Sequence, residues 1–299
     1  MMYPAPFRYH RPENLNAALQ LLQRLGEDAK PLAGGQTLIP MLKMRVGDVT
    51  DLVDIGRLPD LDEIQLGESE ARIGALATHA RIAASSVAQR LPSVRDCAGG
   101  IADAQVRARG TIGGSISTGD PSTDWAPMLH TMAAIVEIQG PGGKREVAID
   151  DFITDAYTTV LQTGELVTGV RIPLPPARSG GAYIGYKRSA PAYPTAAVGI
   201  QLTLDENDVC IAARCVLSAV ASRPVTSAAA DAALVGTRLT EEDLRAAGEL
   251  IIADTNPPAD VRGSADYKRS VLRGLFLQVG AKALQRAKGE NIEGEHNYV

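Results

Sequence analysis

The stretch from Arg107 to Trp125 constrains the fold of this chain more than any other, because it is rich in glycine and hydroxyl side chains and poor in large apolar ones. Such a composition predicts a loop rather than a strand or a long helix. Gly113 and Gly114 allow positive φ angles and a close approach to a ligand. Backbone N–H groups there, with the hydroxyls of Thr111 and Ser115, would suit a phosphate. A lone Gly-Gly pair is, however, more often an ordinary surface turn.

A second loop of the same kind lies near the N-terminus and favours the phosphate interpretation. From Ala33 to Pro40 a Gly-Gly pair again precedes a polar side chain and a hydroxyl, and a short helix is predicted from Leu38 to Met44. Short strands are predicted on either side, at Lys30–Ala33 and Asp51–Ile55. Strand, loop, helix and strand form a compact nucleotide-binding unit. Two matching loops predict one diphosphate held between them.

These residues carry a resemblance to a known family. The two loops, followed by Asp120-Pro121-Ser122-Thr123-Asp124, resemble the FAD-binding medium subunit of the molybdenum hydroxylases, the family of carbon monoxide dehydrogenase and xanthine dehydrogenase. Further motifs extend the resemblance over most of the chain: Leu52-Val53-Asp54-Ile55, Arg72-Ile73-Gly74-Ala75, Val170-Arg171-Ile172-Pro173 and Tyr186-Lys187-Arg188. The resemblance implies FAD as the cofactor, and no catalytic side chain is required because the flavin itself carries the electron chemistry.

Position by position, the resemblance implies which residues contact FAD. The segments Leu32–Leu38 and Thr111–Ser115 hold the pyrophosphate and ribityl chain. Ile101 packs on the cofactor, Val167 lies near the ring, and Lys187 contacts the flavin side. The implied cofactor-binding residues are Leu32, Ala33, Gly34, Gly35, Gln36, Thr37, Leu38, Ile101, Thr111, Ile112, Gly113, Gly114, Ser115, Asp120, Asp124, Val167, Lys187 and Tyr193.

Alternatives stay open at several of these positions. Tyr193 would cover one flavin face, although a tyrosine is also explained by core packing. Ser115 stands where many relatives have Asn, and it keeps a donor and an acceptor on a shorter side chain, so the local contact differs. Asp120 and Asp124 allow three interpretations: a catalytic carboxylate pair, capping of a helix predicted from Asp124 to Met132, or, from the resemblance, binding of the flavin nucleotide by Asp124.

Charge and hydropathy exclude several classes of function. The net charge of −5, without clustered Lys and Arg, argues against nucleic acid as the main partner. No apolar run approaches the roughly 20 residues of a transmembrane helix. The N-terminus lacks the pattern of a signal peptide, so we expect a cytoplasmic protein. Neither the Rossmann glycine pattern nor a Walker A motif occurs, which disfavours a nicotinamide site and a P-loop ATPase.

The cysteines and histidines predict no metal site. The three cysteines include no Cys-x-x-Cys pair, and an iron–sulfur cluster requires four thiolates at characteristic spacings. The four histidines have no metal-ligand spacing and are interpreted as structural or solvated. If electrons arrive through iron–sulfur centres, another polypeptide must hold them. The residues in question are Cys97, Cys210, Cys215, His10, His79, His130 and His296.

The predicted fold class is α+β. An N-terminal two-lobed FAD-binding domain of the molybdenum-hydroxylase flavoprotein type, residues 1–176 with sub-lobes of about 1–57 and 58–176, precedes a C-terminal three-stranded sheet with helices, residues 177–287. The proline-rich stretch Pro173–Pro176 marks the boundary. Residues 288–299 are predicted to be a flexible tail.

Hydrophobic periodicity and turn signals place the other elements. Helices are predicted at Pro12–Leu25, with Asn14 as N-cap, and at Thr78–Ser85, Leu91–Ile101, Pro224–Leu234, Thr240–Ala253 and Ala265–Ala287. Strands are predicted at Glu63–Leu66, Ala71–Ala75, Ala134–Gln139, Lys144–Ile149, Glu165–Ile172, Ala182–Arg188, Ala196–Asp205 and Cys210–Ala219.

By the resemblance, the chain is the FAD-binding electron-transfer subunit of a heterotrimeric molybdenum hydroxylase, assembled as a dimer of heterotrimers. A large subunit with a molybdenum cofactor oxidises the substrate, a small subunit relays electrons through two 2Fe–2S clusters, and this chain passes them to an external acceptor. Two alternatives are a self-sufficient FAD-dependent dehydrogenase with its own small-molecule substrate and a scaffold that has lost FAD. The lack of a convincing histidine or acid pair near the loops disfavours the first alternative, and the intact glycines disfavour the second.

Overall fold

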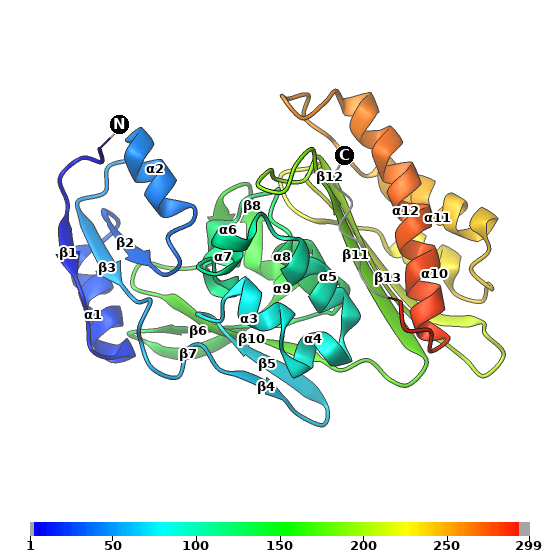
Figure 1. The fold of residues 1–299 in the computed structure, drawn as a ribbon, viewed down its shortest axis with the longest axis horizontal. Helices are drawn as coiled ribbons and strands as arrows, with labels where there is room; N and C mark the ends of the chain where they lie inside the picture. Colours follow the sequence, from blue (N-terminus) through cyan, green and yellow to red (C-terminus); the bar gives the residue numbers. More distant parts are fainter. Residues whose placement is uncertain (1–2, 293–299) are drawn as a thin grey trace.

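The computed structural model describes residues 3–292, which form three parts along the long axis of the molecule (Figure 1). Each part has its own cluster of buried apolar side chains, and the overall architecture is the predicted mixture of helices and sheets. The end of the predicted tail, residues 293–299, lies outside the described residues and includes His296.

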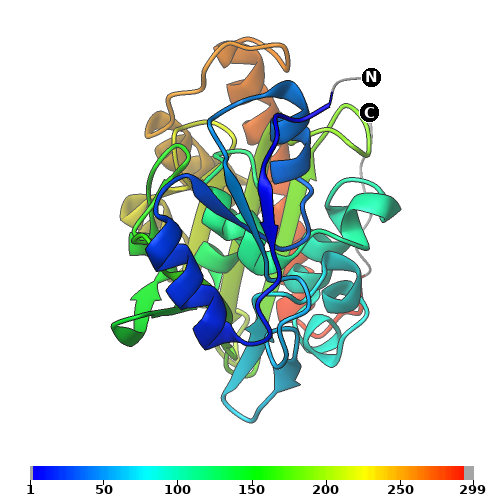
Figure 2. The same cartoon turned by 90° about the vertical axis from the view of Figure 1, so that its left-hand side faces the viewer.

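The N-terminal part is a parallel three-stranded sheet in the order β1-β3-β2, flanked by two helices (Figure 2). Helix α1 begins at Leu15 rather than at the predicted Pro12, because Asn14 is the N-cap and its side chain accepts the Ala17 N–H at 2.9 Å. The bounds are β1 Arg8–His10, α1 Leu15–Leu25, β2 Ala29–Leu32, α2 Leu38–Met44 and β3 Asp51–Asp54, so the prediction for α2 is confirmed.

The middle part is an antiparallel sheet in the order β4-β5-β10-β6-β7, with short helices over one face (Figure 1). Along β6, Val136 and Ile138 are buried while their neighbours are half-buried, the alternation of a sheet with one face on the core. The strands are β4 Ile64–Leu66, β5 Glu70–Gly74, β6 Ile135–Gly140, β7 Gly143–Ala148, β8 Ile153–Asp155, β9 Thr158–Thr159 and β10 Leu166–Pro173. The helices are α3 His79–Ala83, α4 Ser86–Arg90, α5 Pro92–Gly100, α6 Ala104–Arg107, α7 Ile112–Thr118, α8 Trp125–Thr131 and α9 Ile149–Phe152.

The glycine-rich stretch of the middle part is not a loop throughout. Residues 112–118 form the short helix α7, so the prediction of a loop is wrong for this segment. Thr111 caps the helix by accepting the Gly114 N–H at 3.2 Å. Ile112 and Ile116, one turn apart, are both fully buried, and this burial stabilises a helix that glycine-rich residues would not form alone.

The C-terminal part is an antiparallel sheet in the order β11-β12-β13-β14. The three predicted long strands are present, and β14, two residues long, adds a fourth strand at the edge of β13. Helices α10, α11 and α12 cover one face, while α5 and α8 of the middle part pack on the other. The bounds are β11 Ser179–Tyr186, β12 Ala196–Leu204, β13 Cys210–Ser218, β14 Val225–Thr226, α10 Ala228–Leu234, α11 Glu241–Ala253 and α12 Ala265–Ala287.

A buried ion pair joins the middle and C-terminal parts. Arg286 of α12 donates to both carboxylate oxygens of Asp96 in α5, at 2.5 and 3.0 Å, and also to the Gly181 carbonyl at 2.8 Å. Such a bidentate contact fixes the relative orientation of two elements. Helix α5 ends at Gly100, beside the candidate site, so this pair also anchors one wall of that site.

Candidate cofactor site

The two Gly-Gly loops predicted from the sequence meet in space, backbone to backbone. A Cβ atom on Gly34 would lie 2.1 Å from the carbonyl oxygen of Arg109 and 2.9 Å from the Cα atom of Gly110. A Cβ atom on Gly114 would lie 3.9 Å from that of Ala33. Only glycine permits the contact at Gly34, so this residue joins the first loop to the segment that leads into the second.

The first loop presents backbone N–H groups that the chain does not use. Within residues 3–292, the N–H groups of residues 34–37 donate to no protein acceptor, and these residues are half-buried or exposed. Gly35 has a φ of +72°, which glycine adopts without strain. Consecutive unpaired N–H groups at a turn form an anion-binding concavity. The first loop, between Leu32 at the end of β2 and Leu38 at the start of α2, therefore fits a diphosphate.

The second loop differs, because its N–H groups are paired within the chain. The pairs are Ile112 with the Ala77 carbonyl at 3.2 Å, Gly113 with the Ala75 carbonyl at 2.9 Å, Gly114 with the Thr111 hydroxyl at 3.2 Å and Ser115 with the Thr111 carbonyl at 3.0 Å. The expectation that these N–H groups converge on an anion is therefore wrong. The segment after β5 runs beside the loop, and its carbonyl groups accept the N–H groups of Ile112 and Gly113. What the loop offers a ligand is the exposed Gly114 and the Ser115 hydroxyl, which makes no hydrogen bond in the described part of the chain.

A buried network centred on Asp124 lies at the start of α8. Lys187 Nζ lies 3.0 Å from Asp124 Oδ2 and donates to the Gly100 carbonyl at 2.7 Å. The Tyr183 hydroxyl donates to Asp124 Oδ1 at 3.0 Å. Burial, and then the Asp124 charge, hold the pKa of Tyr183 well above its usual range, so the hydroxyl stays a donor. Both carboxylate oxygens of Asp124 are thus occupied by side chains of the C-terminal part.

Asp120 and Asp124 have different surroundings, which disfavour a catalytic carboxylate pair. Asp120 Oδ1 accepts the Ser122 N–H at 2.9 Å, as expected of a carboxylate that closes a turn. Asp124 accepts no N–H from the first turn of α8, so the capping interpretation is wrong for this residue. Its buried ion pair leaves no oxygen for acid–base work. Contact between Asp124 and the flavin nucleotide stays a prediction.

The other predicted residues surround the same region. Tyr193 shares a hydrogen bond with the Thr37 side chain and is 46% exposed, so core packing does not explain it. Burial, and then the Asp120 charge, raise the pKa of its hydroxyl. Ile101 and Val167 are buried in the central core of the middle part, and Ile101 directly follows the Gly100 carbonyl that binds Lys187. Their contacts with FAD also stay predictions.

Sequence reasoning missed Tyr183, Gly100 and Gly110 as parts of this site. Tyr183 is 59 residues from Asp124 in the chain, and Gly100 is 87 residues from Lys187. Contacts over such separations leave no local pattern. Gly110 lies within the glycine-rich stretch Arg107–Trp125, and this membership is the one local feature that could have marked it as part of the site.

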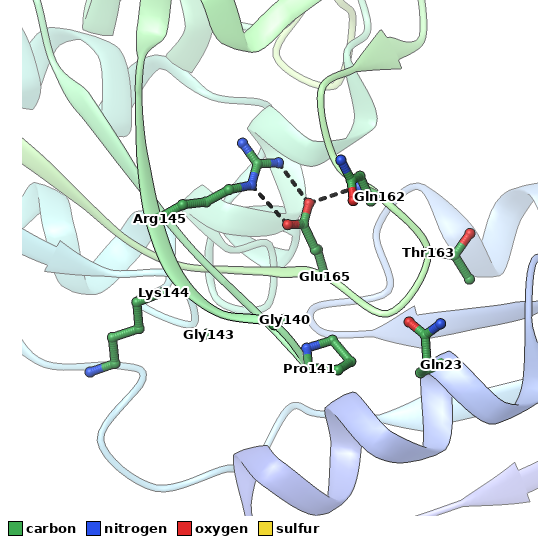
Figure 3. A pocket seen from close by; sticks show the side chains of 10 residues that line it. Gln23, Gly140, Pro141, Gly143, Lys144, Arg145, Gln162, Thr163 and Glu165 are labelled. Carbon is green, nitrogen blue, oxygen red and sulfur yellow. Dashed lines mark hydrogen bonds and ion pairs between the residues drawn. The ribbon is translucent and has the colours of Figure 1, made fainter.

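A separate cavity of about 460 Å³ lies between α1 and the turn of the β6–β7 hairpin (Figure 3). Arg145 donates to both oxygens of Glu165, at 2.8 and 2.6 Å, and Glu165 also accepts the Gln162 N–H at 2.8 Å. The charges of this wall therefore neutralise each other. The lining residues are Gln23, Gly140, Pro141, Gly142, Gly143, Lys144, Arg145, Gln162, Thr163 and Glu165, and they include none of the predicted cofactor residues.

Two backbone loops that meet, one of them with unpaired N–H groups, form the arrangement expected of a nucleotide-diphosphate-binding protein. The family model "FAD binding domain in molybdopterin dehydrogenase" matches residues 5–175, and "CO dehydrogenase flavoprotein C-terminal domain" matches residues 181–283. The chain therefore belongs to the FAD-binding flavoproteins of the molybdenum hydroxylases. It is a component of an oxidoreductase, and its cofactor is FAD.

Individual relatives agree with this assignment. The chain is 41% identical over 288 residues to the carbon monoxide dehydrogenase medium chain of Afipia carboxidovorans, covering 96% of this chain and 98% of the relative. It is 33% identical over 296 residues to the 6-hydroxypseudooxynicotine dehydrogenase complex subunit alpha of Paenarthrobacter nicotinovorans, covering 99% and 100%. A chain of the reconstituted CO dehydrogenase from Oligotropha carboxidovorans superposes with a TM-score of 0.92 at 38% identity, covering 95% of this chain and 100% of that one.

Among residues 3–292, no helix combines the length and apolar character that crossing a bilayer demands. In the same residues, no group of three or more His, Cys, Asp or Glu side chains is arranged to hold a metal ion.

Proposed function

We propose that this chain is the FAD-carrying electron-transfer subunit of a heterotrimeric molybdenum hydroxylase, assembled as a dimer of heterotrimers. It accepts electrons from the 2Fe–2S clusters of a small partner subunit and passes them to an external acceptor. A large partner subunit holds the molybdenum cofactor and oxidises the substrate. In this division of labour, the present chain binds and orients the flavin and needs no substrate-activating side chain.

The observation that carries the proposal is that the charged side chains behind the loops are engaged with one another. Asp124 is held by Lys187 and Tyr183, so neither the carboxylate nor the ammonium is free to activate a substrate. A dehydrogenase with its own substrate would need such a group near the flavin. This pairing supports electron transfer over the self-sufficient alternative.

The cysteines support a separate carrier of the iron–sulfur clusters. Cys97, Cys210 and Cys215 are all free and buried, and burial raises the pKa of each thiol, which disfavours the thiolate that a cluster binds. Free thiols also fit a reducing compartment, and we propose that the complex works in the cytoplasm.

The names of the relatives support a substrate site on another subunit. One relative belongs to a carbon monoxide dehydrogenase and another to a 6-hydroxypseudooxynicotine dehydrogenase, and both cover nearly the whole of this chain. Substrates as different as a diatomic gas and an N-heterocyclic compound require different pockets, whereas a shared flavin site does not change with the substrate.

The test is affinity purification of the full-length chain from its native host, followed by measurement of FAD, iron and molybdenum per chain. We expect one FAD per chain together with two co-purifying polypeptides that carry the iron and the molybdenum. A yellow protein without iron or molybdenum that oxidises a small molecule on its own would overturn the proposal. A colourless chain that takes up no added FAD would do so as well.

A further inference from the structure

His79, the first residue of α3, lies beside the point where the two Gly-Gly loops meet. It is 4% exposed, and its backbone N–H donates to the Gly110 carbonyl at 3.0 Å. The neighbouring residue Thr78 forms a β-bridge with Thr111, the cap of α7. The main chain around His79 is therefore hydrogen-bonded to the start of the second loop.

The side chain of His79 supports the same junction from below. A Cβ atom on Gly110 would lie only 2.7 Å from His79 Nε2 and 2.9 Å from Cδ2, so the imidazole ring is packed against this glycine. Gly110 in turn contacts Gly34 of the first loop, as described above. A continuous line of contacts thus runs from the His79 ring through Gly110 to Gly34.

A hydrogen bond fixes the orientation of the ring. The Trp125 indole nitrogen lies 2.9 Å from His79 Nδ1, and both side chains are buried. Because an indole N–H is only a donor, Nδ1 accepts and the single proton of the neutral ring sits on Nε2. Trp125 begins α8, directly after Asp124, so the bond links the ring to the helix that carries the Asp124 network.

We propose that His79, as a neutral ring held by Trp125, is the positioning residue that keeps the two FAD loops at the separation that FAD binding requires. The proposal depends on the FAD site and not on the direction or partners of electron transfer. His79 touches backbone, and its effect on the cofactor passes through Gly110.

The electrostatic surroundings keep the ring neutral. Burial, and then the cations Arg107 and Lys187, lower the pKa of His79 to about 4. A proton on Nδ1 would face the Trp125 N–H and turn the ring out of its place under Gly110. FAD affinity should therefore fall as the pH approaches 4, which supplies a signature beyond the loss of a packed side chain.

The experiment measures the FAD dissociation constant of the full-length chain, with whatever partners co-purify, by quenching of flavin fluorescence between pH 7.5 and pH 4. His79→Phe keeps a ring under Gly110 but leaves the Trp125 N–H unpaired, and we expect FAD to bind about tenfold more weakly at pH 7.5. The double variant His79→Phe with Trp125→Phe removes donor and acceptor together. We expect it to bind within about threefold of the unmodified chain and to lose the decline toward pH 4.

The matched control is His130→Phe. His130 is also buried, and its Nδ1 donates to the Ala126 carbonyl at 2.7 Å; within residues 3–292, no polar contact found for its ring reaches either loop. This variant should lower the melting temperature and leave the FAD dissociation constant of the folded protein unchanged. The proposal is overturned if His79→Phe binds FAD as tightly as the unmodified chain, or if the double variant keeps the original pH profile. Because the assay reads FAD binding alone, failure here is distinguishable from failure of the electron-transfer proposal.

Discussion

The two Gly-Gly loops look alike in sequence and differ in what their backbones do. In the first loop, the N–H groups of residues 34–37 have no acceptor within the described residues, and these residues are half-buried or exposed. In the second, all four N–H groups from residue 112 to residue 115 donate to carbonyls or to the Thr111 hydroxyl. One loop therefore has free donors, which we predict to bind a diphosphate, whereas the other has an exposed glycine and the hydroxyl of Ser115.

This difference shows that a glycine pair predicts the close approach of another group, but does not tell whether that group is the protein backbone or a ligand. At Gly34 the approaching group is the backbone of Arg109, and at Gly113 it is Ala75, so both glycines serve the contact between chain segments. Of the four loop glycines, Gly114 is the exposed one, so it leaves space for a ligand. In the second loop, one glycine of the pair, Gly113, thus serves the packing of the chain, and the other, Gly114, is left for a ligand.

The largest expected effect is that of Gly34→Ala. The added methyl group would lie 2.1 Å from the Arg109 carbonyl, and a backbone atom cannot move aside as a side chain can. We expect the loops to part and FAD affinity to fall at least about a hundredfold, with a stability loss of about 1–3 kcal/mol. Fluorescence titration and thermal unfolding measure the two effects.

Gly142→Ala provides the control for that change, because nothing lies within 4 Å of its Cβ position in the β6–β7 turn. It should leave both FAD affinity and melting temperature unchanged. If Gly34→Ala behaved like Gly142→Ala, the contact between the loops would not matter for the cofactor.

Hydrogen–deuterium exchange tests the comparison without a mutation. In the FAD-free protein, amides of residues 112–115 should exchange slowly because they are hydrogen-bonded, and those of residues 34–37 should exchange fast. Adding FAD should slow the first loop by about tenfold or more and change the second loop much less. Equal protection of both loops before FAD is added would contradict the assignment of free and paired donors.

A pair of alanine substitutions separates the two glycines of the second loop. Gly113→Ala places a methyl group 2.6 Å from Ala75 Cβ and 2.8 Å from its carbonyl oxygen, so we expect a loss of about 1–3 kcal/mol in the free energy of unfolding. Gly114→Ala approaches closely only the Thr111 hydroxyl, at 2.9 Å, because Ala33 Cβ lies 3.9 Å away, at ordinary contact distance. It should cost about 1 kcal/mol while weakening FAD binding at the exposed face. Denaturant unfolding beside FAD titration distinguishes the two, and a larger stability loss for Gly114→Ala would reverse our assignment.

The smallest expected effect is that of Thr111→Val. It removes the hydroxyl that caps α7 while keeping the shape of the buried side chain, which should cost about 1 kcal/mol of stability. Thr111→Ser keeps the capping hydroxyl and should retain the cap. Denaturant unfolding of both variants makes the measurement, and a larger loss for Thr111→Ser than for Thr111→Val would show that the methyl group, and not the hydroxyl, matters.

Local signals predicted several elements well. The short helix predicted after the first loop, Leu38–Met44, is α2, with the bounds that the structure shows. Asn14 was predicted as a helix cap, and its side chain accepts the N–H of Ala17, three residues later. Such features depend on residues within one or two turns, so the sequence contains the whole interaction.

Two other elements could not be predicted from neighbouring residues in the sequence, each for a physical reason. Helix α7 contains two adjacent glycines, whose low helix propensity argues against a helix, and it forms because Ile112 and Ile116 are buried against the rest of the middle part. Strand β14 has two residues, too few for a periodic pattern, and exists only through its pairing with β13.

By itself, the sequence determined the family and the flavin cofactor, because glycines at fixed spacings within short motifs can be identified without knowledge of the tertiary structure. That the two Gly-Gly loops bind FAD stays a prediction. Only the tertiary structure decided which N–H groups remain free, that Lys187 neutralises Asp124 across 63 residues, and that the His79 ring, held by Trp125 across 46 residues, supports the loop junction. Hydrogen bonds and ion pairs between distant segments depend on how sheets and helices pack, and that packing is a property of the whole chain.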